Sequence, residues 1–243
     1  MNTKFIADLH LSPEHPEIVQ LFVHFLNEQS QNKDLQALYI LGDLFEAWIG
    51  DDFVPPGVEP VIQALSQLSE SGTKIYFMRG NRDFLIGDNF CKRTGCRLLP
   101  DHQVIDLYGT PTLLMHGDLL CSDDVDYMNV RKMLRNPQWQ QDFLSKTVPE
   151  RIALAQAARQ ESQQKTQQLD SEIMDVNQQT VIDTMAQWQV SQLIHGHTHR
   201  PHTHRFSVNG NTATRIVLGD WYHQGSVLEC DEHGCQLRSL SIS

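Results

Sequence analysis

The chain has 243 residues, of which 40% are hydrophobic, and a formal net charge of -11 at pH 7. This length and apolar content suit one large α/β domain or two small ones, and we interpret the chain as one domain with an insertion. The acidic balance excludes a general affinity for nucleic acid, because binding to the phosphate backbone requires a basic face. No apolar run approaches the roughly 18 residues of a membrane span, so we expect any membrane contact to be peripheral.

Short apolar runs that each end at a metal-capable side chain are the main feature of the sequence. We interpret five of them as buried strands, and the residues that follow these strands are Asp8, His10, Asp43, Asn81, His116, His197 and His199. Open α/β sheets bind ligands beyond the carboxyl ends of their strands, which is where these side chains should gather. One such residue alone is usually a helix cap or an ordinary buried polar group. The repetition in five places predicts one shared site.

Helical spacing alternates with strands in the first part of the chain. Apolar residues recur every three or four positions over residues 16–26 and over residues 58–71, where Gly72 marks a helix end. These helices separate strands expected at residues 4–7, 38–41 and 75–78. The resulting β-α-β order is typical of a parallel sheet.

A long helical insertion follows two further strands. These strands are expected at residues 98–107 and 112–115, on either side of a turn. From residue 123 to residue 188 the sequence is polar, rich in glutamine and helical in spacing. Pro137 and Pro149 should divide it into separate helices, because proline interrupts a helix interior.

The sheet resumes at Gln192 and closes with antiparallel strands. Asn209-Gly210 is a strong hairpin signal, because both residues readily adopt positive φ, and Glu232-His233-Gly234 indicates a second hairpin. The predicted fold class is therefore α/β. Its core comprises residues 1–122 and 170–243, and a helical cap is inserted at residues 123–169.

The cap region concentrates basic residues. Between residues 131 and 165 there are seven basic and three acidic side chains, a local balance of +4 that leaves -15 for the rest of the chain. Apolar and aromatic residues lie among them, namely Met133, Leu134, Trp139, Phe143, Leu144 and Val148. This composition suits a lid on an anionic lipid surface, but an ordinary helical hairpin can have it too.

The five cysteines form no Cys-x-x-Cys pair, and their number is odd. Both observations favour reduced thiols in a cytoplasmic protein. We assign no chemistry to these residues, which are Cys91, Cys96, Cys121, Cys230 and Cys235.

The seven candidate ligands exceed the needs of a single ion. Three offer carboxylate or amide oxygens and four offer imidazole nitrogens, so two divalent ions with free positions for water fit them better. A carboxylate that bridges two cations holds them about 3.5–4 Å apart, and such a pair can act on both oxygens of a phosphoryl transfer. We assign Asp43 as the bridge. Nitrogen and oxygen ligands without a thiolate favour Mn²⁺.

The order of these residues resembles the hallmark of the calcineurin-like metallophosphoesterases. The matching blocks are Asp8-Leu9-His10, Gly42-Asp43, Gly80-Asn81, His116 and Gly196-His197-Thr198-His199. The resemblance implies a sandwich of mixed β-sheets flanked by helices. It also implies a first metal ion held by Asp8, His10, Asp43 and His199, and a second held by Asp43, Asn81, His116 and His197.

Arg82 departs from the general pattern of that superfamily, in which a histidine usually follows Gly-Asn. A histidine can protonate an alkoxide leaving group, whereas arginine offers fixed charge and a planar fork of donors to phosphate oxygens. Our hypothesis is that the leaving group is itself a phosphate. Asp43 and Arg82 are the expected catalytic residues, and water is the expected nucleophile, because no serine or cysteine is suitably placed beside a base.

A closer resemblance, over nearly the whole chain, is to the UDP-2,3-diacylglucosamine diphosphatase family of lipid A biosynthesis. It is carried by residues 5–11, 38–52, 80–85, 116–118, 173–177 and 194–201. The resemblance implies that water attacks the α-phosphorus of UDP-2,3-diacylglucosamine to give UMP and 2,3-diacylglucosamine 1-phosphate. Carried over position by position, the substrate contacts are Asn81, Arg82, Asp124, Ser162, Thr166 and His197. At Leu169 family members can carry a basic residue instead.

The resemblance and the cap composition together predict a peripheral protein on the cytoplasmic face of the bacterial inner membrane. Its partners would be the lipid substrate and the membrane surface, and the sequence implies no protein or nucleic-acid partner. A dimetal hydrolase of a soluble nucleotide or dinucleotide polyphosphate is one alternative, although Arg82 and an apolar cap do not favour it. A non-catalytic scaffold with the same fold is another, but it has no need of seven aligned ligands.

Overall fold

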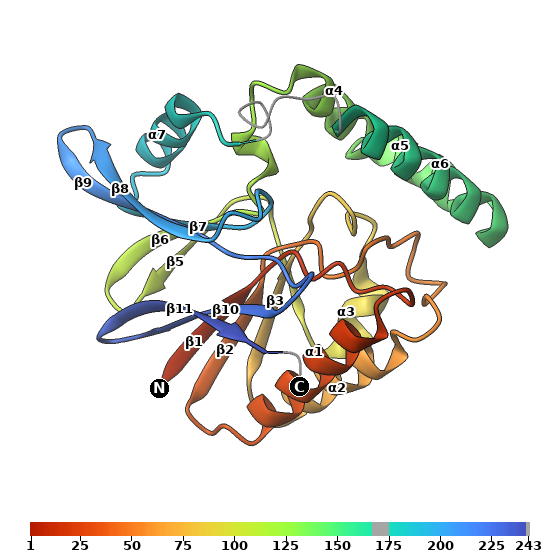
Figure 1. Cartoon of the computed structure of the whole chain (residues 1–243), viewed down its shortest axis with the longest axis horizontal. Helices are drawn as coiled ribbons and strands as arrows, with labels where there is room; N and C mark the ends of the chain where they lie inside the picture. The colour runs from red at the N-terminus through yellow and green to blue at the C-terminus, as the bar shows by residue number, and fades with distance from the viewer. Residues whose placement is uncertain (167–174, 242–243) are drawn as a thin grey trace.

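The computed structural model of the chain describes residues 1–166 and 175–241, with the backbone alone for residues 161–166. The strands of this part form two facing sheets flanked by helices (Figure 1). The six-stranded sheet has the order β11-β10-β1-β2-β3-β4, and the five-stranded sheet has the order β5-β6-β7-β9-β8. Both sheets contain parallel and antiparallel pairs, so the predicted α/β class with mixed sheets is confirmed.

The six-stranded sheet is parallel except at one edge. Its parallel strands are β1 (Asn2–Ile6), β2 (Leu35–Ile40), β3 (Lys74–Met78) and β4 (Arg97–Leu99). Beside β1 run the antiparallel strands β10 (Gly225–Asp231) and β11 (Gly234–Leu240). The carboxyl ends of β1, β2 and β3 therefore lie at one edge of the sheet, as their β-α-β order predicted.

The five-stranded sheet brings together the ends of the two strands that precede His116 and His197. Its strands are β5 (Gln103–Leu107), β6 (Thr110–Leu114), β7 (Gln192–His195), β8 (His202–Val208) and β9 (Asn211–Val217). Since β6 and β7 are parallel neighbours, they end at the same edge. The expected hairpin joins β8 to β9, and its turn residues Asn209 and Gly210 have φ values of 51° and 80°.

Helices cover the outer face of each sheet. The helices α1 (Pro16–Ser30), α2 (Glu59–Glu70) and α3 (Asp88–Thr94) share a core cluster with the six-stranded sheet. The helix α7 (Gln178–Gln187) buries Val181 and Met185 against Leu113 and Leu193 of the other sheet. In Figure 1 these two helical layers lie on opposite sides of the sheets.

A separate apolar cluster fills the space between the sheets. Phe5 of β1 packs there with Leu114 of β6 and Ile194 of β7, whereas the next residue, Ile6, belongs to the cluster on the helical side. The carboxyl end of β1 is thus buried on both faces, which explains why an uninterrupted apolar run, Phe5-Ile6-Ala7, begins there. Each large side chain buried in this way stabilises the fold by about 1.5–3 kcal/mol.

The described part of the cap contains three helices after the short 3-10 helix η1 (Asp118–Leu120). They are α4 (Val125–Leu134), α5 (Pro137–Leu144) and α6 (Val148–Thr166), and Figure 1 shows them above the sheets, apart from α1 to α3. Pro137 and Pro149 occupy the first turns of α5 and α6, as expected for residues that divide a helical segment. The predicted boundary at residues 169 and 170 lies outside the described residues. None of the described helices is long and apolar enough to cross a membrane.

One predicted strand is wrong. Residues 98–107 form two strands in different sheets, because β4 pairs with β3 while β5 pairs with β6. The chain leaves the first sheet at Pro100, which cannot donate a hydrogen bond to a continuing ladder. This crossing carries the chain from one layer of the sandwich to the other.

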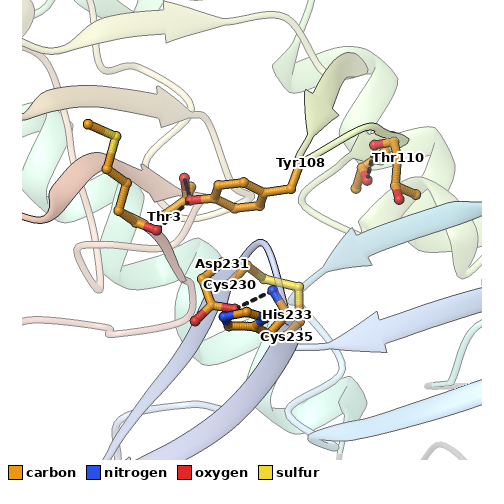
Figure 2. Close-up of a disulfide and its surroundings, with 9 residues drawn as sticks. Thr3, Tyr108, Thr110, Cys230, Asp231, His233 and Cys235 are labelled. Atoms are coloured by element: carbon orange, nitrogen blue, oxygen red, sulfur yellow. Dashed lines mark hydrogen bonds between the residues drawn. A yellow bond between two sulfur atoms is a disulfide. The ribbon is translucent and has the colours of Figure 1, made fainter.

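The expectation of five reduced thiols is also wrong, because Cys230 and Cys235 form a disulfide. Figure 2 shows this bond at the turn of the β10–β11 hairpin, where the N–H of His233 donates to Asp231 Oδ1 at 2.8 Å. The two cysteines are directly opposite each other in the ladder. The turn that was predicted at this hairpin therefore places their side chains within bonding reach.

Candidate metal centre

All seven candidate metal ligands meet at the edge where the strands of both sheets end. Asp8 and His10 follow β1, Asp43 follows β2 and Asn81 follows β3 in the six-stranded sheet. The five-stranded sheet contributes residues that follow β6 and β7, namely His116, His197 and His199. The side chains of Asp8, His10, Asp43 and His116 are buried.

The first group of ligand atoms comes from Asp8, His10 and His199. Nε2 of His10 lies 3.3 Å from Nε2 of His199, which in turn lies 3.4 Å from Oδ1 of Asp8. One ligand atom from each of the three lies within 4.8 Å of the others. These distances suit three atoms that converge on one ion.

The second group comes from Asn81, His116 and His197. The side-chain oxygen of Asn81 lies 2.9 Å from Nε2 of His116 and 3.0 Å from Nδ1 of His197. Burial, together with the charge of the neighbouring His116, lowers the pKa of His197 to about 4. Its imidazole is therefore neutral near pH 7, the form that can bind a metal ion.

Asp43 lies between the two groups. Its Oδ2 atom is 3.9 Å from Nε2 of His10 and 3.8 Å from Nε2 of His116. Its other oxygen, Oδ1, accepts a hydrogen bond of 2.8 Å from the backbone N–H of Arg82. One carboxylate oxygen is thus anchored to the protein, and the other faces both groups of ligands.

The backbone at these positions adopts a conformation that residues other than glycine rarely take. The φ values of Asp8, His10, Asp43, His197 and His199 lie between 50° and 70°. Such left-handed residues cost about 1–3 kcal/mol each and are concentrated at functional sites. The fold therefore holds five of the seven candidates in strained positions that aim their side chains at one another.

Close backbone contact also surrounds the two central carboxylates. A Cβ atom on Gly80 would lie 2.1 Å from Oδ1 of Asp43, and one on Gly196 would lie 2.3 Å from Oδ2 of Asp8. Only glycine fits at either position. The two glycines therefore fix how far each carboxylate extends into the site.

Oxygen atoms behind the histidines hold their rings in the orientation of metal ligands. Nδ1 of His116 lies 2.8 Å from the Leu41 carbonyl oxygen, and Nδ1 of His10 lies 3.2 Å from Glu46 Oε2. In each ring Nε2 then faces the site. Metal-bound histidines typically have such a partner on the second nitrogen.

The residues present fit two divalent cations. Oδ1 of Asp8 is buried and, among the described residues, has no hydrogen-bond partner. A buried carboxylate oxygen without a partner is expected where the atom serves as a ligand of a cation. The donor set consists of carboxylate and amide oxygens and imidazole nitrogens, without a thiolate. The structure therefore brings the predicted ligands together, and the two groups on either side of Asp43 match the division that the resemblance implies.

Glu46 was not identified from the sequence as a site residue. Besides His10, its carboxylate lies 3.8 Å from Nη1 of Arg82 and 3.3 Å from Nη2 of Arg159 in the cap helix α6. Burial acts to raise the pKa of Glu46, but His10 and the two arginines lower it below its usual value, so the side chain stays ionised. One buried carboxylate thus contacts a candidate metal ligand, a candidate catalytic residue and the cap.

Asp83 is a second missed residue. Its buried carboxylate accepts hydrogen bonds of 2.8 Å from the backbone N–H groups of Leu44 and Gly80. It therefore ties the loop after β2 to the loop after β3. Burial and the nearby Asp43 raise its pKa to about 6.

Two arginines of the cap donate hydrogen bonds to acceptors outside the cap. Arg131 donates to Asp118 Oδ2 at 2.6 Å and to Asp101 Oδ2 at 2.7 Å, and Arg135 donates to the Arg79 and Gly80 carbonyl oxygens at 3.2 and 3.0 Å. Asp118 is buried, and it also accepts from the Tyr127 hydroxyl at 2.9 Å. Arg131 and Arg135, two of the seven basic residues counted in the cap region, are thus paired with residues outside the cap.

The candidate substrate residues divide into three groups. Asn81 and His197 lie among the ligands, and Arg82 lies beside them with 29% of its side chain exposed. Asp124 caps α4, where its side chain accepts from the Tyr127 N–H at 2.9 Å. Ser162 and Thr166 belong to the end of α6, and their side chains lie outside the described part of the structure. Leu169 also lies outside the described residues.

Residues 1–201 match the model of the calcineurin-like phosphoesterase family, and the chain therefore belongs to that family. Over its full length it is similar to proteins named UDP-2,3-diacylglucosamine hydrolase. One from Stenotrophomonas maltophilia (strain K279a) is 51% identical over 248 residues, with 99% of each chain covered. One from Photobacterium profundum is 49% identical, with 100% of this chain and 98% of that protein covered. The resemblance predicted from the sequence blocks is confirmed.

Proposed function

We propose that this chain hydrolyses the pyrophosphate bond of UDP-2,3-diacylglucosamine. Water attacks the α-phosphorus, the bond from this phosphorus to the bridging oxygen breaks, and 2,3-diacylglucosamine 1-phosphate leaves, while UMP keeps the oxygen that comes from water. The main structural support is the position of Asp43 Oδ2, which faces the two groups of candidate ligands at 3.8 and 3.9 Å. The identity of about half of all residues with proteins named for this activity supports the choice of substrate.

Two divalent cations, which we propose to be Mn²⁺, would be held by the two groups of ligands on either side of Asp43. When bound, such a pair activates water and neutralises charge on the phosphates. The chain itself orients the ligands through the left-handed backbone and positions Arg82 at the exposed side of the site. The Arg82 guanidinium would bind phosphate oxygens of the leaving group and stabilise the charge that develops there.

Substrate recognition would extend from the metal centre into the cap. Asn81, Arg82 and His197 would contact the phosphates, and Asp124 would contact the substrate from the first turn of α4. We retain Ser162 and Thr166 of α6 as proposed contacts. The cap is linked to the centre through Arg159 and Glu46, which gives α6 a direct connection to the phosphate site.

We also propose peripheral binding to the cytoplasmic face of the inner membrane through the cap. Five of the nine large hydrophobic side chains that are exposed in the described part belong to it: Val125, Val130, Met133, Leu144 and Leu154. Lys132 and Lys146 are exposed in the same region, unlike the inward-facing arginines. An apolar surface with lysines suits acyl chains and anionic headgroups.

The decisive experiment measures UMP release from UDP-2,3-diacylglucosamine by the purified protein. The protein would be assayed with Mn²⁺, with EDTA and as the Asp43→Ala variant, beside a soluble dinucleotide polyphosphate as a second substrate. Asp34→Ala, at an exposed position outside the site, is the matched control. We expect the wild-type protein and Asp34→Ala to turn over the lipid substrate with Mn²⁺. EDTA and the Asp43→Ala substitution should each abolish this turnover. Turnover only of the soluble substrate would contradict the lipid assignment and keep the metal centre, while no turnover of either would contradict both.

A further inference from the structure

Two cysteine side chains outside the metal centre meet at the end of α3. Cys91 lies within α3, and Cys96 follows the helix directly before β4. Their Sγ atoms are 3.3 Å apart, within hydrogen-bonding range for two thiols. Cys96 is buried and Cys91 is half-buried, and both belong to the core on the helical side of the six-stranded sheet. Packing therefore holds the two sulfur atoms together.

The turn at Gly95 explains why the thiols meet. Gly95 has a φ of 73°, and its N–H donates to the Cys91 carbonyl oxygen at 2.8 Å. A Cβ at this position would lie 2.1 Å from Ser69 Oγ, so only glycine allows the turn so close to α2. The 3.3 Å gap between the sulfur atoms exceeds a disulfide bond by roughly 1.3 Å, which is within the reach of side-chain rotation.

The two thiols differ in acidity. Their shared hydrogen bond lowers the pKa of Cys96, because the thiolate left after loss of the first proton still accepts the S–H of its neighbour. The same interaction raises the pKa of Cys91. Cys96 is therefore the sulfur that ionises first, and a thiolate is the nucleophile in thiol oxidation.

We propose that Cys91 and Cys96 form a modification site that a peroxide converts into a reversible disulfide. The Cys96 thiolate attacks a peroxide oxygen, the O–O bond breaks, and a sulfenic acid forms while water or an alcohol leaves. The Cys91 sulfur then attacks the Cys96 sulfur, and the S–O bond breaks with loss of a water molecule. The two thiols together give up two electrons and two protons, and the peroxide takes up these electrons and protons.

A tryptic map under non-reducing conditions tests this directly, because Lys92 and Arg93 separate the two cysteines. Trypsin places Cys91 and Cys96 on different peptides, 83–92 and 94–97, which stay joined only if the disulfide has formed. The protein would be treated with hydrogen peroxide, quenched with catalase, alkylated and digested. We expect the joined peptide pair after peroxide and its loss after reduction with dithiothreitol. The count of alkylated thiols should fall from the three free cysteines to one.

Three single variants provide the controls. Cys121→Ser removes the third free thiol and should still form the joined pair at an unchanged rate. Cys91→Ser and Cys96→Ser should each fail to give the joined peptide pair. Peroxide should not cause a reversible loss of two alkylated thiols in either variant. The proposal is overturned if wild-type protein, under peroxide that fully oxidises free glutathione, shows no joined 83–92 and 94–97 peptides. It is also overturned if either sulfur is found bonded to Cys121 instead. None of these readouts depends on the phosphoesterase activity.

Discussion

The metal centre and the cap are held in place by different kinds of structure. The ligands follow strand ends, most are buried, and five of them have a left-handed backbone fixed by the sheets on either side. The helix α4 has no buried residue, and the cap is joined to the core both through arginine pairs with core carboxylates and through Phe143 and Trp139, which pack against the core cluster on the helical side. The candidate metal ligands thus depend on rigid sheet edges, whereas the cap is a separate layer attached by ion pairs and by a few apolar contacts.

The first prediction addresses the rigid side of this comparison and has the largest expected effect. Gly80→Ala places a Cβ 2.1 Å from Oδ1 and 2.4 Å from the backbone nitrogen of Asp43, so this carboxylate has to move. We expect kcat/KM for the lipid substrate to fall by more than the roughly 100-fold that loss of an outer metal-site partner can cause. The control is Gly109→Ala, where nothing lies within 4 Å of the new Cβ and the φ of 87° strains only the turn between β5 and β6. Equal activity in the two variants would contradict the close fit around Asp43.

The second prediction removes an arginine that attaches the cap through two ion pairs, with Asp101 and with Asp118. Arg131→Met leaves the buried charge of Asp118 without its arginine partner, which costs roughly 3 kcal/mol in the free energy of unfolding. Urea denaturation followed by circular dichroism measures this change. Arg238→Met, which removes an exposed pair with Glu229, is the control and should change the free energy by less than about 1 kcal/mol. Similar losses in both variants would show that the cap does not depend on this pair.

The third prediction concerns Glu46, the residue that contacts both regions. Glu46→Gln keeps the shape of the side chain but removes the charge that faces His10, Arg82 and Arg159. We expect Mn²⁺ affinity or kcat to decrease by about 10–100-fold, the usual effect of losing the partner of a ligating histidine. Calorimetric titration with Mn²⁺ and steady-state kinetics separate the two effects. Glu59→Gln, at an exposed carboxylate paired with Arg93, should leave both quantities unchanged.

The smallest effect is expected at the outer surface of the cap. A lysine near an anionic membrane contributes about 1 kcal/mol, so Lys132→Gln and Lys146→Gln should each weaken vesicle binding roughly fivefold. Flotation with vesicles that contain phosphatidylglycerol measures this, and vesicles of phosphatidylcholine alone should show no difference between variants. Lys33→Gln, at an exposed position outside the cap, is the control. Binding that is insensitive to anionic lipid would contradict the proposed membrane surface.

The gathering of the candidate ligands at one sheet edge was predictable from the sequence because its signals are local. Each ligand directly follows an apolar strand, and parallel strands bring such ends together without further information. The helices also followed from local spacing and from prolines at their first turns. The two regions therefore differ in predictability as well, because the attachment of the cap depends on residues that are distant in sequence.

The missed features share this long-range character. Nothing near Arg131 in the sequence indicates that Asp101 and Asp118 will bind it. The crossing from β4 to β5 depends on which sheet accepts each strand, which an apolar run does not specify. The Cys230–Cys235 bond is different, since the predicted turn at residues 232–234 already implied that the two residues face each other.

The position of β1 between β2 and β10 affects how the protein is made. Phe5 pairs with Tyr39 on one side and with Leu228 on the other, and the Asp8 carbonyl oxygen accepts from the N–H of Trp221. On the ribosome β1 therefore gains its first neighbour early and its second only after residue 228 has emerged. Until then Asp8 and His10 lie on an open sheet edge without their later partners. A nascent chain thus cannot complete the loops that carry Asp8 and His10 before nearly all of the sandwich has been synthesised.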